Sequence, residues 1–184
     1  MRKLLYCILL ILLLGGCEIF DLRDSEYPSA PPNWNSSTGT LQQLEQNLGY
    51  CYADSRNVVK YLGLFSSSYS FHFAPQDVVD YGIPATWTRS DEQDMLINLH
   101  SQASQITLSI EPSAVSPDEI LANEARLFRT YQITVKNGGN LHNYTGSMEL
   151  QVRRENGYWY IYRWYDYRIG NEPGWGKLKY DYSQ

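Results

Sequence analysis

The hydrophobic pattern of the chain changes its period in the second half of the sequence. In the first half, apolar residues recur every three or four positions, as they do along a helix that is buried on one face. Leu41, Leu44 and Leu48 follow Thr40, a residue type that caps helix N-termini, so a helix is predicted to begin after Thr40. The apolar stripe resumes after an Ala-Asp-Ser break at 53–55. The pattern therefore predicts two consecutive helices, or one bent helix.

Three further elements are predicted before the period changes. Tyr69, Phe71 and Phe73 alternate with polar residues, which indicates one buried face of a short strand. The proline-containing stretch 74–88 predicts a loop with a single turn of helix. Ser90 and the acidic residues after it are typical of a helix N-terminus, so a further helix is predicted to begin there.

Beyond residue 103, apolar and polar residues alternate, which is the period of a strand that buries one face. This pattern covers 104–112, 124–137, 144–154 and 157–170. One face of the second segment carries Leu127, Arg129, Tyr131, Ile133 and Val135. The turn sequences Asn-Gly-Gly-Asn and Glu-Asn-Gly separate the last three segments and predict an antiparallel meander. The fold class is therefore predicted as α+β, with N-terminal helices packed on one face of a curved antiparallel sheet.

The order of these elements resembles the nuclear transport factor 2-like domain, also called the SnoaL-like or cystatin-like cone. Stretch 53–73 is similar to the segment in which the first helices of that domain lead into its first strand, and stretch 157–168 is similar to its closing strand. The Trp-x-Ile-x-x-Trp-x-Asp strand and the Trp-Gly-x-Leu-Lys tail within 172–182 are similar to bacterial lipoproteins of this fold whose roles are undescribed. The resemblance covers about residues 40–180. It implies a pocket at the open end of the cone, which members use as an isomerase, cyclase or dehydratase site or as a binding cavity.

The first residues have the pattern of an export signal. Arg2 and Lys3 precede an apolar run at 4–14, which is shorter than the ~20 residues of a membrane-spanning helix and has the length of a signal-peptide core. Leu-Gly-Gly-Cys at 14–17 resembles the lipobox of bacterial lipoproteins. The resemblance implies that residues 1–16 are a cleaved signal peptide and that Cys17 is acylated. Acyl chains gain ~0.8 kcal/mol of binding free energy per buried methylene, and they would then anchor the protein to a membrane through Cys17.

The lipobox resemblance also implies a location and a domain division. The chain is expected in the bacterial cell envelope, lipid-anchored, and Glu18 after the cysteine favours the outer membrane, facing the periplasm or the cell surface. Residues 17–39 are rich in Pro, Ser, Asn and Asp without a sustained period, which predicts a flexible tether after the acylated cysteine. Residues 40–184 are predicted to form a single α+β cone domain.

Composition excludes several classes of protein. The chain of 184 residues has a net charge of −5, and loss of Arg2 and Lys3 with the leader makes it −7, which argues against binding nucleic acid. Once Cys7 has left with the leader and Cys17 carries lipid, Cys51 is alone, and its helical apolar context predicts burial rather than reactivity. No cofactor is predicted, because no cofactor-binding fingerprint is present. No metal site is predicted either, because the three histidines are far apart in the sequence: His72, His100 and His142.

The candidate pocket residues are Asp166, Arg129, Tyr131 and Trp164. Asp166 either acts in acid–base chemistry, with a pKa shifted by burial, or is a structural carboxylate paired with Arg163 or Arg168. Arg129 lies among apolar residues and either serves as a cation in the pocket or extends to solvent at the edge of the sheet.

The chain has sixteen tyrosines and five tryptophans, which are especially dense at 158–167, and one core cannot bury all of them. Exposed aromatic residues near arginine are typical of surfaces that bind proteins or carbohydrates, unless the C-terminal tail covers them. The chain is thus predicted to be a membrane-anchored, exported lipoprotein with a non-catalytic binding or scaffolding domain for a small hydrophobic ligand or an envelope protein. The alternative is a small pocket enzyme of the ketosteroid-isomerase or dehydratase type. An open cone would favour a pocket, and an interior filled by aromatic side chains would favour partners on the outer face of the sheet.

Overall fold

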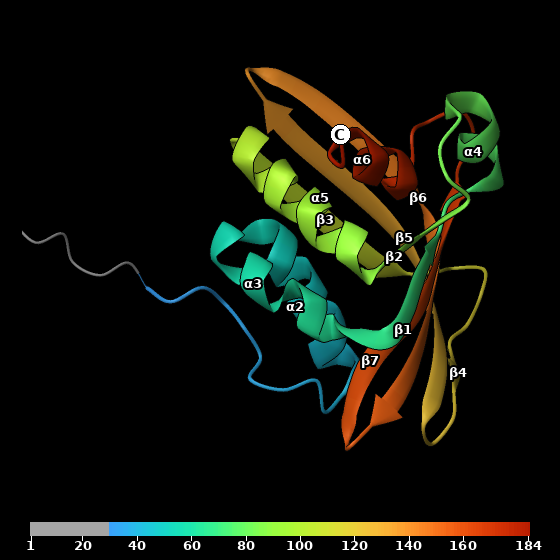
Figure 1. Cartoon of the computed structure of the whole chain (residues 1–184). Helices are drawn as coiled ribbons and strands as arrows, with labels where there is room; N and C mark the ends of the chain where they lie inside the picture. The colour runs from blue at the N-terminus through green and yellow to red at the C-terminus, as the bar shows by residue number, and fades with distance from the viewer. Residues whose placement is uncertain (1–29) are drawn as a thin grey trace, which may run out of the picture. The chain divides into compact units, whose positions relative to one another are not determined.

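The computed structural model describes residues 30–184, of which residues 32–184 form one compact unit (Figure 1). Its helices are α2 (Leu41–Ala53), α3 (Val58–Tyr61), α4 (Pro75–Tyr81), α5 (Arg89–Gln102) and α6 (Trp175–Asp181), with the 3-10 turns η1 (Ser55–Asn57) and η2 (Leu62–Leu64). Its strands are β1 (Phe65–His72), β2 (Thr86–Thr88), β3 (Gln105–Pro112), β4 (Glu119–Ile120), β5 (Glu124–Asn137), β6 (Asn140–Glu155) and β7 (Tyr158–Arg168).

The strands form one seven-stranded sheet in the order β2-β1-β7-β6-β5-β3, and β4 pairs with β5. The α+β class and the predicted meander of β5, β6 and β7 are confirmed. The sheet is mixed rather than wholly antiparallel, because the last strand returns beside β1 and runs parallel to it. The meander turns contain Gly138, Gly139 and Gly157 at positive φ, a conformation that glycine adopts without steric cost.

Helix α2 begins where the pattern predicts. The Thr40 hydroxyl accepts a hydrogen bond from the Gln43 backbone N–H at 3.2 Å, and the Gln43 side chain accepts one from the Thr40 N–H at 3.1 Å. This capping box satisfies two of the N–H groups that a helix start leaves unpaired. The helix ends at Ala53, and Asp54 caps the turn η1 that follows. Of the two alternatives, consecutive helices are therefore the one observed.

The region after β1 is more regular than the sequence predicts. The stretch expected to be a loop with one turn of helix contains the two-turn helix α4 and the short strand β2. Helix α5 is capped by Thr88 rather than by Ser90, because the Asp91 carboxylate accepts hydrogen bonds from both the N–H and the hydroxyl of Thr88, at 2.7 and 2.8 Å. The predicted helix is correct, but its N-cap and first residue lie two positions earlier than predicted.

The core lies between the helices and one face of the sheet. Figure 1 shows α2, α5 and α6 on the concave side of the curved sheet. The predicted inward face of β5 is buried: Leu127, Arg129, Tyr131, Ile133 and Val135. Tyr69, Phe71 and Phe73 are buried together, as predicted for the first strand. Removal of these apolar faces from water is the main force that holds the layers together.

The folded unit begins before residue 40, the predicted boundary of the domain. The Asn35 N–H donates to the Asn47 side-chain oxygen at 2.8 Å, and the Asn47 amide donates back to the Asn35 carbonyl at 3.1 Å. The Trp159 N–H at the start of β7 donates to the Thr38 carbonyl at 2.8 Å. Residues 35–38 are thus bound to the domain, although their composition is that of a tether.

The predicted leader, residues 1–16, and the acylated Cys17 lie outside the described residues. From residue 30 to the C-terminus, no helix combines the length and the apolar character needed to cross a membrane.

Candidate functional site

Two of the predicted pocket residues, Tyr131 and Asp166, meet on the inner face of the sheet. The Tyr131 hydroxyl donates a hydrogen bond to Asp166 Oδ1 at 2.6 Å. Tyr131 lies on β5 and Asp166 on β7, so the phenol crosses the strand between them at Gly146, its register partner on β6. A Cβ at position 146 would lie 2.3 Å from the Tyr131 hydroxyl oxygen. Only glycine leaves room for this contact.

The first turn of α6 is bound to this pair. The Gly176 N–H donates to Asp166 Oδ2 at 2.8 Å, and the Trp175 N–H donates to the Tyr131 hydroxyl oxygen at 2.7 Å. A carboxylate at a helix N-terminus satisfies N–H groups that have no partner inside the helix. Asp166 and Tyr131 therefore hold the C-terminal helix in place, and both side chains are buried.

Burial raises the pKa of Asp166 to about 6, while its hydrogen bonds with Tyr131 and Gly176 oppose the shift and the nearby Asp77 adds to it. Because the folded pKa lies above the ordinary value of 3.8, the folded state binds the proton more tightly than the unfolded state does. This contribution to stability is fully present below pH 3.8 and is lost as the pH rises to about 6.

Asp166→Asn is expected to remove this pH dependence, because an amide does not ionise. Relative to the variant, the wild type is expected to lose roughly 2 kcal/mol of unfolding free energy between pH 4 and pH 7. Urea unfolding of both chains at the two pH values measures the difference. A wild-type-minus-variant difference that stays constant with pH would contradict it.

Neither arginine considered as a structural partner of Asp166 fills that role. Arg168 binds Asp77 and Asp80, with N–O distances of 3.3 and 2.5 Å. Arg163 is exposed to solvent. The carboxylate of Asp166 is matched instead by the phenol of Tyr131 and the backbone of α6.

Arg129, the third predicted pocket residue, is engaged by carboxylates of two other segments. It is buried, and its guanidinium binds Glu45 of α2 at 2.5 Å and Asp118 at 2.6 Å. It lines a surface pocket of about 410 Å³ between α2 and β3. The structure therefore does not join Arg129 to Asp166.

Trp175 of α6 fills the interior of the cone. Its fully buried ring packs edge-on against Trp164, Tyr131 and Tyr52, with centroid distances of 4.6, 5.0 and 5.2 Å. The Trp175 Nε1–H donates to the Tyr52 hydroxyl oxygen at 2.9 Å. Trp164, the fourth predicted pocket residue, is also fully buried, between Trp175 and Phe71. Aromatic side chains thus occupy the space in which the sequence analysis expects a pocket.

A buried ion pair that the sequence analysis missed lies beside these rings. Glu92 of α5 binds the ammonium of Lys179 of α6, and neither side chain has any exposed surface. The Glu92 carboxylate also accepts hydrogen bonds from the Tyr61 hydroxyl at 2.7 Å, the Tyr69 hydroxyl at 2.6 Å and the Trp87 Nε1–H at 3.0 Å. These partners satisfy a charge that would be costly to bury alone.

The Lys179 ammonium also lies over aromatic faces, 4.0 Å from the ring centroids of both Phe71 and Trp164. Burial lowers the pKa of Lys179 to about 8, and Glu92 counteracts that shift. One feature of the sequence could have predicted that Lys179 is buried. Lys179 comes four residues after Trp175 and directly after Leu178, so it lies on the apolar side of a short helix, where lysine is rarely found.

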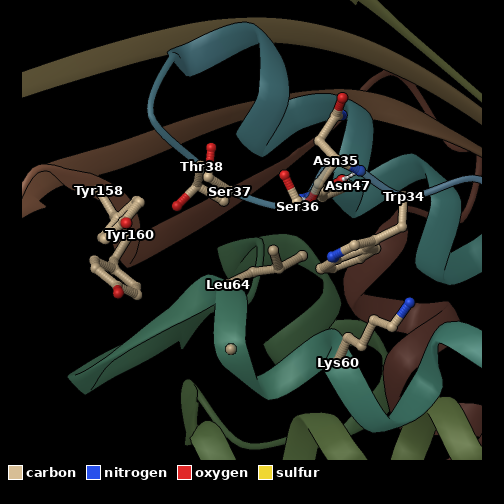
Figure 2. A pocket seen from close by; sticks show the side chains of 11 residues that line it. Trp34, Asn35, Ser36, Ser37, Thr38, Asn47, Lys60, Leu64, Tyr158 and Tyr160 are labelled. Atoms are coloured by element: carbon tan, nitrogen blue, oxygen red, sulfur yellow. Dashed lines mark hydrogen bonds between the residues drawn. The ribbon is translucent and has the colours of Figure 1, made fainter.

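The pockets of the described part lie at its surface. Five of them have volumes of about 230 to 410 Å³, and neither Asp166 nor Trp164 lines any of the five. Figure 2 shows the one of about 230 Å³, in which Tyr158 and Tyr160 lie at one end and Trp34 and Lys60 at the other. Residues 30–184 contain no cluster of three His, Cys, Asp or Glu side chains placed to hold a metal ion.

No protein-family model and no curated protein matches the sequence. Solved structures match its fold. A protein from Novosphingobium aromaticivorans assigned as an aromatic ring hydroxylase aligns with a TM-score of 0.59 at 13% identity, over 78% of this chain and 93% of that one. A second protein from the same organism, assigned as a scytalone dehydratase, aligns with a TM-score of 0.55 at 14% identity, over 73% and 90%.

A protein from Thiobacillus denitrificans assigned as a calcium/calmodulin-dependent protein kinase type II association domain aligns with a TM-score of 0.55 at 9% identity, over 74% of this chain and all of that one. At these identities the likeness concerns the fold alone. The chain therefore has the nuclear transport factor 2-like cone fold that its sequence resembles. Neighbours with this fold include both enzymes and an association domain, so the fold does not choose between catalysis and binding.

Proposed function

We propose that the chain is a lipid-anchored protein of the bacterial cell envelope whose cone domain binds or scaffolds a partner at its surface and does not catalyse a reaction. The observation that carries the non-catalytic part is the filled interior. Trp175, Leu178 and Lys179 of α6 are fully buried inside the cone, and the ionisable pair Asp166 and Tyr131 is engaged with the same helix. A catalytic acid or base has to reach a substrate, and Asp166 lines none of the five described pockets. Tyr131 lines one of about 260 Å³, but its hydroxyl is engaged with Asp166 and the Trp175 N–H.

Solvent access to the tryptophans tests the filled interior. Trp34 is half-buried at the surface, whereas the other four tryptophans have between 0 and 8% of their surface exposed. In a Trp34→Phe chain, acrylamide is therefore expected to quench tryptophan emission weakly. Adding Trp175→Ala opens a cavity next to Trp164 and is expected to raise the Stern–Volmer constant several-fold. Equal, strong quenching of both chains would mean that the cone is open and would refute the proposal.

The anchor is proposed from the lipobox at 14–17. In a bacterial host, an alkyne-labelled palmitate is expected to be incorporated into the wild-type chain and into Cys7→Ser, whose changed residue belongs to the leader. Cys17→Ser is expected to lose the label. Retention of the label by Cys17→Ser, or its loss from both variants, would count against acylation of Cys17.

One observation favours the alternative of a small pocket enzyme. The buried Asp166, with its pKa near 6 and its hydrogen bond from Tyr131, is the type of group that general acid–base chemistry uses. Catalysis would require α6 to leave the interior, since its first turn covers both side chains. Strong acrylamide quenching in the Trp34→Phe chain would support this alternative.

A further inference from the structure

The pocket in Figure 2 is built by three segments that are distant in sequence. Residues 34–38 form one wall, η2 forms the floor with Leu64, and the start of β7 contributes Tyr158 and Tyr160. Lys60 of α3 lies at the far end, near Trp34. The pocket therefore exists only when the segment before α2 is bound to the domain.

That wall is fixed by hydrogen bonds to its backbone groups. The two bonds between Asn35 and Asn47, at 2.8 and 3.1 Å, hold the chain next to Trp34, and the bond from Trp159 N to the Thr38 carbonyl holds the other end at β7. Asn47 is itself fully buried. A site whose walls are already ordered loses less entropy when a ligand binds.

The side chains around this pocket combine aromatic faces with unpaired hydroxyl and N–H groups. Among residues 30–184, no hydrogen-bond partner exists for the indole N–H of Trp34 or for the hydroxyls of Ser36, Ser37, Tyr158 and Tyr160. No carboxylate lines the pocket. The lining thus offers uncharged donors and acceptors beside flat apolar surfaces.

The single cation of the lining is already engaged. Lys60 Nζ donates to the Asn57 side-chain oxygen at 3.1 Å and lies 4.8 Å from the centroid of the Trp34 ring. One engaged lysine in a chain of net charge −5 does not favour a phosphate or another polyanion. A purely apolar ligand is disfavoured as well, because it would leave the hydroxyl and indole groups without partners.

We propose that this pocket binds one pyranose ring of an uncharged glycan. The C–H face of a sugar ring is apolar and stacks on aromatic side chains, while its ring of hydroxyls both donates and accepts hydrogen bonds. The volume of about 230 Å³ is small for a drug-sized ligand and is of the size of a single ring. This inference rests on the proposed function, since it names the ligand class of a binding domain.

The test is an NMR titration of residues 30–184 with methyl β-glucopyranoside and methyl β-N-acetylglucosaminide. Sorbitol is the matched control, because it carries hydroxyls but has no ring face. The Trp34 indole N–H signal is expected to shift and saturate with either glycoside, with a Kd of about 1 mM for so small a ligand, and not with sorbitol. The indole signals of the buried tryptophans are expected to stay in place.

Two tyrosines of β7 provide the matched variants. Tyr158→Ala, in the pocket, is expected to weaken glycoside binding at least tenfold, whereas Tyr167→Ala, an exposed tyrosine of the same strand outside the pocket, is expected to leave it unchanged. Both tyrosines are exposed, so both variants are expected to fold, and the unchanged buried indole signals check this.

Each outcome decides the inference. No saturable shift with either glycoside, an equal response to sorbitol, or unchanged affinity in Tyr158→Ala would overturn the sugar site and leave the proposed function intact. Shifts of the Trp164 and Trp175 indole signals would place the ligand inside the cone, and would overturn both the sugar site and the proposed function.

Discussion

Trp175→Ala is expected to lower the free energy of unfolding by about 3–5 kcal/mol. The substitution empties the centre of the cone, where the indole has no exposed surface and contacts the rings of Trp164, Tyr131 and Tyr52. It also leaves the Tyr52 hydroxyl without its indole donor. Urea unfolding measures the loss.

Trp34→Ala is the matched control for this substitution. Trp34 is only half-buried, packs against the edge of the core and lies beside Lys60, so its removal is expected to cost about 1–2 kcal/mol. Similar losses for the two variants would mean that Trp175 does not fill the core.

Glu92→Gln is expected to cost about 3–5 kcal/mol, because it leaves the Lys179 ammonium buried without a counter-charge. The amide of glutamine keeps the shape of the side chain. Glu92 accepts hydrogen bonds from Tyr61, Tyr69 and Trp87, and the NH₂ group of glutamine cannot accept them. The same urea measurement applies.

A double variant separates the charge from the packing. Lys179→Met keeps much of the volume of the lysine and removes its charge, so Glu92→Gln combined with Lys179→Met no longer buries a lone ammonium. We expect the double variant to be about 1–3 kcal/mol more stable than Glu92→Gln alone. A double variant less stable than the single one would show that the loss comes from packing and not from the unpaired charge.

The local elements of the fold could be predicted from the sequence because their causes are local. Thr40 and the leucine spacing after it specify the start of α2, and the alternation around Tyr131 specifies which face of β5 is buried. The glycines of the two meander turns specify the antiparallel pairing of the last three strands. These signals rest on backbone geometry and on a period of two or 3.6 residues.

The candidate site could be predicted only in part, because its contacts join distant residues. Tyr131 and Asp166 share the face that the alternation indicates, but their meeting depends on Gly146, which no periodic pattern marks. The hydrogen bond between Trp175 and Tyr52 spans 123 positions of the sequence. A seven-residue helix such as α6 carries too few positions for its period to show which surface it will cover.

The position of α6 has a consequence for the timing of folding. The side chains that complete the core belong to residues 175–182, which follow every strand of the sheet in the sequence, and β1 gains its parallel neighbour only when β7 has been made. During vectorial synthesis the hydrophobic interior therefore stays open until α6 has been made. A chain truncated after residue 172 would keep all seven strands but lose the Trp175 and Leu178 side chains that fill the interior, so its core would stay open.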